Sequence, residues 1–166
     1  MDDLTQSELQ ELLHYDPLTG VFTWLKARRG VKVGAECGRI NVHGYREIGV
    51  KLKLRQANRL AWLYMKGELP PDNMEVDHRN RDKADNRWDN LRLATKSQNA
   101  ANVATKTNNT SGIPGVVWDA QRNCWRAQLR VDGVKKNLGR FATKEEAAAK
   151  VASVAKAQWG EFWAAA

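Results

Sequence analysis

The sequence predicts an α+β protein of two modules: a larger one of mixed helices and strands, and a smaller one built of a three-stranded antiparallel sheet followed by a helix. Short alternating or β-branched runs, typical of strands, are interspersed with apolar stripes at helical spacing. The segment TKTNNTSG, residues 105–112, favours turns over packed elements. We therefore expect a first domain at 1–105, a linker at 106–111 and a second domain at 112–166.

The charge of the chain indicates a polyanionic partner. Among 166 residues, 27 are Lys or Arg and 19 are Asp or Glu, which gives a formal net charge of +8. Residues 1–105 carry +3 and residues 106–166 carry +5, so the shorter part is the more basic. Nucleic acid is the first expected partner and an acidic membrane surface is the competitor. No stretch approaches the roughly 18–20 apolar residues of a membrane span, and the acidic start MDDLTQSELQELL is unlike a signal peptide, so we expect a cytoplasmic protein.

The first domain is expected to begin with a helix over residues 5–15, where Thr5 and Glu8 match a capping box. The turn sequence DPLTG ends it, and residues 21–27 and 44–54 are expected strands. A packed helix follows, ended by Gly67. Its apolar stripe consists of Ala57, Leu60, Ala61, Tyr64 and Met65.

The segment MEVDHRNRDKADNRWDNLRLATKSQNAAN, residues 74–102, holds the candidate site. Val76-Asp77-His78 is expected to end a short strand, LRLAT to form a second, and KSQNAANVA a helix that carries Asn99. A hairpin with a helix across it can bring Asp77 and Asn99 to one ion, and such oxygen ligands suit Mg²⁺. Successive side chains of a strand alternate, so His78 points away from Asp77 and can act as a general base.

These residues resemble the HNH nucleases with the ββα-metal fold, in particular the phage-type HNH homing endonucleases. The resemblance extends over YDPLTGVFTW, GYREIGV, RLAWLYMKGELP, VDH, DNRWDNLRLAT and SQNAAN. It implies His78 as the general base and Asp77 and Asn99 as ligands of one Mg²⁺ or Mn²⁺ ion. It also implies Asn90 as the asparagine that holds the histidine's loop, and we expect Asn90 to fix the His78 ring.

Two asparagines depart from the family pattern: Asn99 stands where the family name has histidine, and Asn58 where relatives commonly have one. Asn80, Asn86 and Asn102 are interpreted as turn or cap residues, with Asn86 kept as an alternative member of the site.

The expected activity is metal-dependent hydrolysis of double-stranded DNA at a preferred site, which leaves 5′-phosphate and 3′-hydroxyl ends. One site per chain favours a monomer that nicks one strand, whereas a dimer would cut both. No protein partner is implied, and the resemblance suggests a phage protein in the host cytoplasm or a bacterial one. The alternative is a DNA-binding regulator that does not cleave and retains a relic nuclease fold; a structural RNA-binding protein is a third interpretation.

The second domain is expected to contain three strands, broken at residues 121–123 and at Asp132-Gly133, and a helix over 144–159 capped by Thr143. On the middle strand, long polar side chains alternate with apolar ones, which makes one sheet face basic. A sheet with such a face can enter the major groove of DNA. The pattern G-V-x-W, W-x-A-x-L-R, L-G-x-F and EEAA resembles an AP2-type DNA-binding domain over residues 112–162.

Two groups of residues are candidate DNA contacts. The expected contacts of the second domain are Arg122, Arg126, Gln128, Arg130, Lys135 and Arg140. The expected contacts of the first domain with backbone phosphates are Arg28, Arg29, Arg46, Lys51, Lys53 and Arg55. Within the latter group, Lys51, Lys53 and Arg55 are expected to share one strand face.

Overall fold

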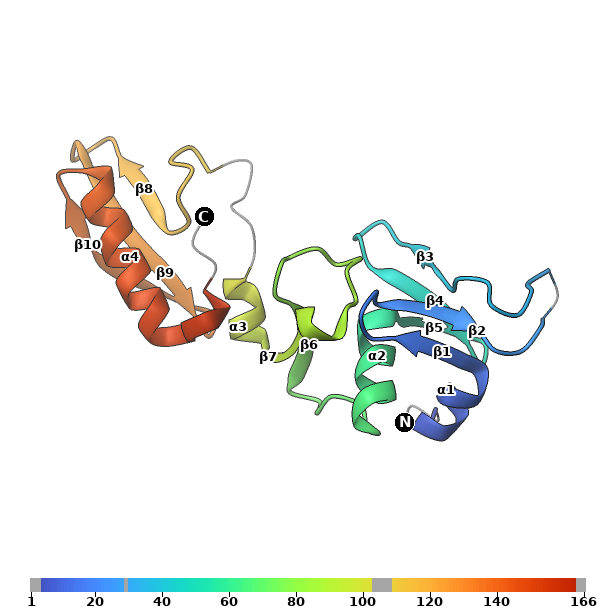
Figure 1. The fold of residues 1–166 in the computed structure, drawn as a ribbon. Coiled ribbons are helices and arrows are strands. Elements are labelled where there is room, and N and C mark those ends of the chain that lie inside the picture. Colours follow the sequence, from blue (N-terminus) through green and yellow to red (C-terminus); the bar gives the residue numbers. More distant parts are fainter. Residues whose placement is uncertain (1–3, 29, 103–108, 164–166) are drawn as a thin grey trace. The chain divides into compact units, whose positions relative to one another are not determined.

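The computed structural model describes residues 4–28, 30–102 and 109–163 (Figure 1). The chain separates by its internal contacts into two units, Met1–Ala94 and Thr95–Ala166. Each unit has its own hydrophobic core, and helices combine with antiparallel sheets in both, so the mixed helix and sheet class is confirmed. The division of the chain into two functional domains joined by a linker at 106–111 stays a prediction.

The first unit begins with α1 (Gln6–Leu12), whose N-terminus carries the expected capping box between Thr5 and Glu8. The expected extension of this helix to residue 15 is wrong. Leu13–Asp16 is a strand, β1, which pairs with β2 (Val21–Trp24). An extended conformation places Leu13 and Tyr15 on the same side of the strand, where both are buried in the core. DPLTG therefore forms the turn of a hairpin.

A three-stranded sheet follows, made of β3 (Arg39–Ile40), β4 (Arg46–Val50) and β5 (Lys53–Gln56). The expected single strand over 44–54 is wrong, because Lys51 and Leu52 have positive φ angles of 48° and 62° and form the tight turn between β4 and β5. Lys51 therefore does not share a strand face with Lys53 and Arg55.

Helix α2 (Ala57–Lys66) ends at Gly67, which adopts the left-handed conformation that glycine tolerates. Its buried face includes Ala57, Leu60 and Ala61 as expected. Met65 is wrongly assigned to this face: its side chain is exposed, and Leu63 is buried instead. Strands β6 (Met74–His78) and β7 (Leu91–Thr95) form a separate two-stranded sheet, and the short helix η1 (Trp88–Asn90) leads into β7.

The second unit begins with α3 (Lys96–Ala101) and continues into a sheet of three antiparallel strands in the order β10-β9-β8. The bounds of the strands are Val116–Asp119, Cys124–Val131 and Val134–Phe141 for β8, β9 and β10. The turn at Asp132-Gly133, with φ angles of 50° and 79°, is the expected hairpin turn.

Helix α4 (Lys144–Trp159) lies along one face of this sheet, and η2 (Gly160–Phe162) follows it (Figure 1). The expected range and the Thr143 cap of α4 are both confirmed. Ala147, Val151 and Ala155 are buried against apolar residues of the sheet, including Ala127 and Leu129. None of the helices in the described part of the chain has the length and apolarity needed to cross a membrane.

Candidate functional site

The β6–β7 hairpin carries the two residues singled out first, Asp77 and His78, at the end of β6. Both side chains are buried, with exposed fractions of 5% and 4%. The preceding residue is fixed by Asn58 of α2, whose Nδ2 donates to the carbonyl oxygen of Val76 over 2.9 Å. Asn58 is itself buried, so this position ties α2 to the strand that bears the site.

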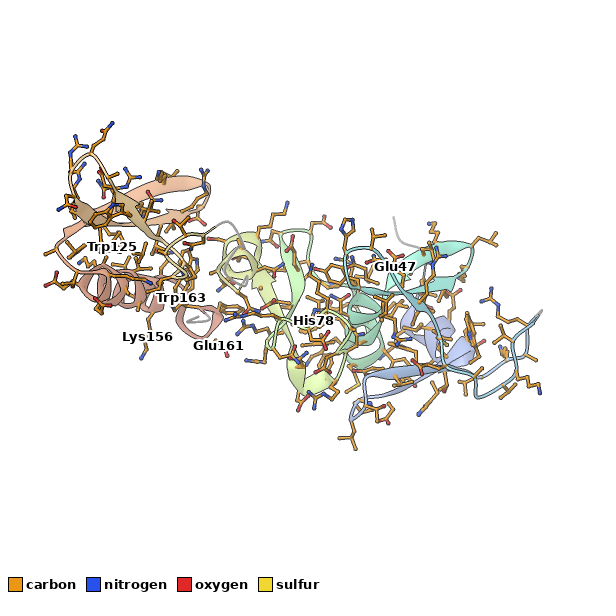
Figure 2. The ribbon with its side chains drawn as sticks, turned by 90° about the horizontal axis from the view of Figure 1, so that it is seen from above. Glu47, His78, Trp125, Lys156, Glu161 and Trp163 are labelled. Atoms are coloured by element: carbon orange, nitrogen blue, oxygen red, sulfur yellow. The ribbon has the colours of Figure 1, made fainter. Side chains whose placement is uncertain are left out.

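Figure 2 labels His78, and the ring of this residue is oriented by Asn86. His78 Nε2 lies 3.2 Å from Asn86 Oδ1, while Asn86 Nδ2 donates to the carbonyl oxygen of Ala84 over 3.0 Å. Because the amide oxygen accepts, Nε2 carries the proton and Nδ1 carries the lone pair. Burial lowers the pKa of His78 below its ordinary value, which favours the neutral imidazole that a general base requires.

Asn90 holds the loop that follows His78 and not the ring, so the expected contact of Asn90 with the ring is wrong. Its Nδ2 donates to the carbonyl oxygen of Asp85 over 2.7 Å, and its Oδ1 accepts from the backbone N–H of Asn80 over 3.0 Å. Its backbone oxygen accepts from the N–H of Arg79 over 2.9 Å. The ring contact comes instead from Asn86, which is 2% exposed.

Asp85 strengthens the same loop. Its carboxylate accepts from Nε and Nη2 of Arg87 over 2.8 and 2.7 Å, and from Nδ2 of Asn80 over 2.7 Å. The paired hydrogen bonds from the Arg87 guanidinium lower the pKa of Asp85 to about 2. The loop between β6 and β7 is thus fixed by Asn90 and Asp85 together.

Asp77 forms an ion pair with Arg92 of β7. Nε and Nη2 of Arg92 both lie 2.9 Å from Asp77 Oδ2, and the two side chains are only 5% and 7% exposed. The pair orients the carboxylate and compensates its charge inside the protein. Sequence reasoning missed Arg92 in this role; the available signal was a basic residue between two leucines of an otherwise apolar strand.

Asn99, the second expected metal ligand, lies on α3. This helix belongs to the second unit and has its own capping box between Thr95 and Gln98. In the described residues, no group of three or more His, Cys, Asp or Glu side chains could hold a metal ion. The expected ligands are one carboxylate and one amide, a pair of hard oxygen donors whose chemistry suits Mg²⁺ or Mn²⁺. The sharing of one ion by Asp77 and Asn99 stays a prediction.

The comparison with known families concerns this same part of the chain. Residues 55–101 match the HNH endonuclease family. The matched segment contains Asp77, His78, Asn86, Asn90 and Arg92.

The relatives are viral proteins. An uncharacterized HNH endonuclease of Acanthamoeba polyphaga mimivirus is 26% identical over 146 residues, which cover 88% of this chain and 67% of that protein. Protein 3.8 of Escherichia phage T7 is 33% identical over 78 residues, 47% of this chain and 64% of that protein. The matches thus span about two thirds of the length of these relatives. A solved structure of the HNH homing endonuclease I-HmuI, described as binding and cleaving DNA, has 20% identity and a TM-score of 0.42, with 85% of this chain and 78% of that chain covered.

Beyond the HNH segment, the sheet of the second unit has one polar face. Arg126, Gln128 and Arg130 of β9 alternate with residues buried against α4. Their partners across β10 are Arg140, Asn137 and Lys135. Five of the six expected contacts of this domain, Arg126, Gln128, Arg130, Lys135 and Arg140, therefore lie on two adjacent strands.

Two atoms on this face are unusual. Arg126 Nε and Gln128 Oε1 are buried and have no hydrogen-bond partner in the described part of the chain. Arg122 lies in the turn before β9, and it shares Asp119 with Arg140, at 3.6 and 3.7 Å. Trp125 packs its ring 5.0 Å from that of Trp118.

The basic residues of the first unit differ in their surroundings. Arg28 stacks on Trp24 at 4.4 Å, whereas Lys53 is exposed on β5. Arg46 bonds to Glu36 over 2.7 Å, and Arg55 is buried and donates to the carbonyl oxygen of Val50 over 2.6 Å. Lys51 contacts Glu8 from the β4–β5 turn. Arg29 lies outside the described residues, and the phosphate contacts of the whole group stay predictions.

Proposed function

We propose that this protein is a divalent-metal-dependent endonuclease that hydrolyses phosphodiester bonds of double-stranded DNA. The observation that carries the proposal is the environment of His78. The side chain is buried beside Asp77, its Nε2 is engaged by Asn86, and it lies in the segment that matches HNH endonucleases. The name of the mimivirus relative agrees with a nuclease, and the basic charge of the chain agrees with DNA as substrate.

The proposed reaction uses His78 as the general base. Nδ1 takes a proton from a water molecule as the water oxygen bonds to phosphorus, and the bond from phosphorus to the 3′ oxygen breaks. The departing oxygen takes up a proton from solvent, which leaves a 3′-hydroxyl and a 5′-phosphate, and His78 then releases its proton to solvent. Asn86 keeps Nε2 protonated, so the lone pair stays on Nδ1 throughout the approach of water.

Asp77 and Asn99 are the residues that would hold one Mg²⁺ or Mn²⁺ ion. When bound, the ion stabilises negative charge on the phosphate and on the leaving oxygen. Arg92 keeps the Asp77 carboxylate in a fixed orientation through its two 2.9 Å contacts. A carboxylate fixed in this way loses little freedom when it acts as a ligand.

The second unit is proposed to hold the DNA in an AP2-like manner. Its polar sheet face offers arginines and a glutamine, which are the side chains that pair with guanine and adenine in the major groove. The unpartnered Arg126 Nε and Gln128 Oε1 support this, because buried polar atoms cost free energy until they find a partner. The exposed cations of the first unit, Arg28 and Lys53 among them, would contact phosphates.

Incubation of supercoiled plasmid with the protein tests the proposal. With Mg²⁺ or Mn²⁺ we expect relaxed circles, the product of a monomer that nicks one strand, and a chelator should abolish them. Linear product would indicate that both strands are cut. Plasmid that stays supercoiled with either metal, yet shifts in a gel, would contradict cleavage and favour a regulator that only binds DNA.

A further inference from the structure

The N-terminal hairpin packs directly against the loop that carries Asn86. Its turn, residues 17–20, lies between β1 and β2, about 70 residues before that loop in the sequence. Trp88 donates its backbone N–H to the carbonyl oxygen of Pro17 over 2.9 Å. The hairpin contributes none of the residues assigned to the candidate site above, so this contact calls for an explanation.

Tyr15 is the main link between the two segments. Its ring is buried, stacked on Phe22 at 4.6 Å and edge-on to Tyr64 at 5.6 Å. Its hydroxyl donates to the backbone oxygen of Asn86 over 2.7 Å. The hydrogen bond fixes the main chain of the residue whose side chain meets His78.

Gly20 provides a second link. Its φ angle is +74°, and a β-carbon at this position would lie 2.4 Å from the backbone nitrogen of Arg87 and 2.4 Å from the carbonyl carbon of Asn86. Such distances are far below van der Waals contact. The turn can approach the Asn86 main chain this closely only because residue 20 has no side chain.

We propose that the β1–β2 hairpin is the positioning element of the general base, with Tyr15 and Gly20 as positioning residues that hold Asn86 where its side chain fixes the His78 ring. The catalytic part of this inference rests on the proposed nuclease function. The coupling itself, from Tyr15 through Asn86 to His78, is a property of the folded protein and can be measured without DNA. A small displacement of Asn86 would release the ring, because the contact to Nε2 is already 3.2 Å long.

The first test compares Tyr15→Phe with Tyr64→Phe in the full chain. Both changes remove one hydroxyl from the same aromatic cluster and keep the ring, but no hydrogen bond of the Tyr64 hydroxyl is found among the described residues. The side-chain nitrogens of His78 are observed by two-dimensional NMR in metal-free protein, and His78→Ala identifies its signals among the three histidines. Wild type and Tyr64→Phe should show the Nε2–H tautomer, and Tyr15→Phe a mixture of tautomers.

The second test compares Gly20→Ala with Gly34→Ala. Both glycines have positive φ angles, +74° and +83°, so both alanines suffer the same backbone strain, but a β-carbon at position 34 meets nothing within 4 Å. Only Gly20→Ala should alter the His78 signals. In plasmid cleavage, Tyr15→Phe should lower kcat about 5-fold and Gly20→Ala on the order of 10-fold or more, with KM unchanged.

Different results would overturn the positioning role of the hairpin and the proposed nuclease function. Unaltered His78 signals and unaltered kcat in Tyr15→Phe and Gly20→Ala would overturn the positioning role. A change in the His78 signals restricted to these two variants supports the coupling, even if no variant and no wild-type protein cleaves DNA. Absence of cleavage by wild type would overturn the proposed function alone. If kcat falls as much in the controls Tyr64→Phe and Gly34→Ala as in Tyr15→Phe and Gly20→Ala, the loss reflects general destabilisation. That result would also overturn the positioning role.

Discussion

The ion pair between Asp77 and Arg92 gives a quantitative prediction for Arg92→Leu. Both side chains are at least nine-tenths buried, and two guanidinium nitrogens lie 2.9 Å from one carboxylate oxygen. Removal of one partner from such a pair costs about 3–5 kcal/mol, because the remaining charge stays in a poorly solvated site. With a urea m value of about 2 kcal/mol per molar, the unfolding midpoint of the first unit should fall by about 2 M.

The assay is urea unfolding of wild type, Arg92→Leu, Asp77→Asn and the double variant. We expect the double variant to be more stable than Arg92→Leu, since the uncompensated carboxylate is gone. Glu11→Gln is the control, because it breaks the exposed pair between Lys26 and Glu11 and should cost less than about 1 kcal/mol. A loss in Arg92→Leu as small as in the control would refute the reasoning that this pair fixes Asp77.

Three further predictions concern DNA binding and acid stability. In a mobility-shift assay, Arg126→Ala should weaken DNA binding on the order of 10-fold. Lys156→Ala, which removes the same charge from α4, should have little effect. Equal losses of binding in the two variants would contradict a special role of the sheet face. The logarithm of the binding constant should fall linearly with the logarithm of salt concentration, by about 0.9 per neutralised phosphate, and a flat response would contradict phosphate contacts. Because the pKa of Asp85 is lowered to about 2, its contribution to stability is present above its ordinary value of 3.8 and is lost as pH falls toward 2. Urea midpoints between pH 5 and pH 2 should therefore fall less in Asp85→Asn than in wild type, and parallel curves would argue against this.

Local sequence signals predicted much of the fold. The capping box at Thr5, the cap at Thr143 and the turn at Asp132-Gly133 depend on residues within a few positions of one another, and all three are confirmed. The polar face of β9 followed from alternation along a single strand. Predictions of this kind succeed because neighbours in the chain determine the result.

Features that depend on distant parts of the chain were missed or misassigned. Leu13 continues the helical spacing of Leu9 and Leu12, and only pairing with β2 and burial in the core select the strand from Leu13 on. The contact of Asn86 with His78 depends on the path of the loop between β6 and β7. Spacing alone did not distinguish Asn86 from Asn90, because the two residues lie only four positions from each other and have the same amide side chain.

Cys37 is one of the two free cysteines of the chain. It is buried in the first core, and burial raises the pKa of its thiol to about 12. Cys37 is therefore a packing residue at neutral pH, with no thiolate for chemistry.

The role of His78 as general base is the central claim, and one comparison tests it most directly. Wild type and His78→Ala are incubated with supercoiled plasmid in Mg²⁺, and their binding to the same DNA is measured by mobility shift. Loss of a general base costs typically 10²–10⁴-fold in rate, so we expect His78→Ala to bind like wild type and to leave the plasmid supercoiled. Cleavage by His78→Ala at the wild-type rate would contradict the account.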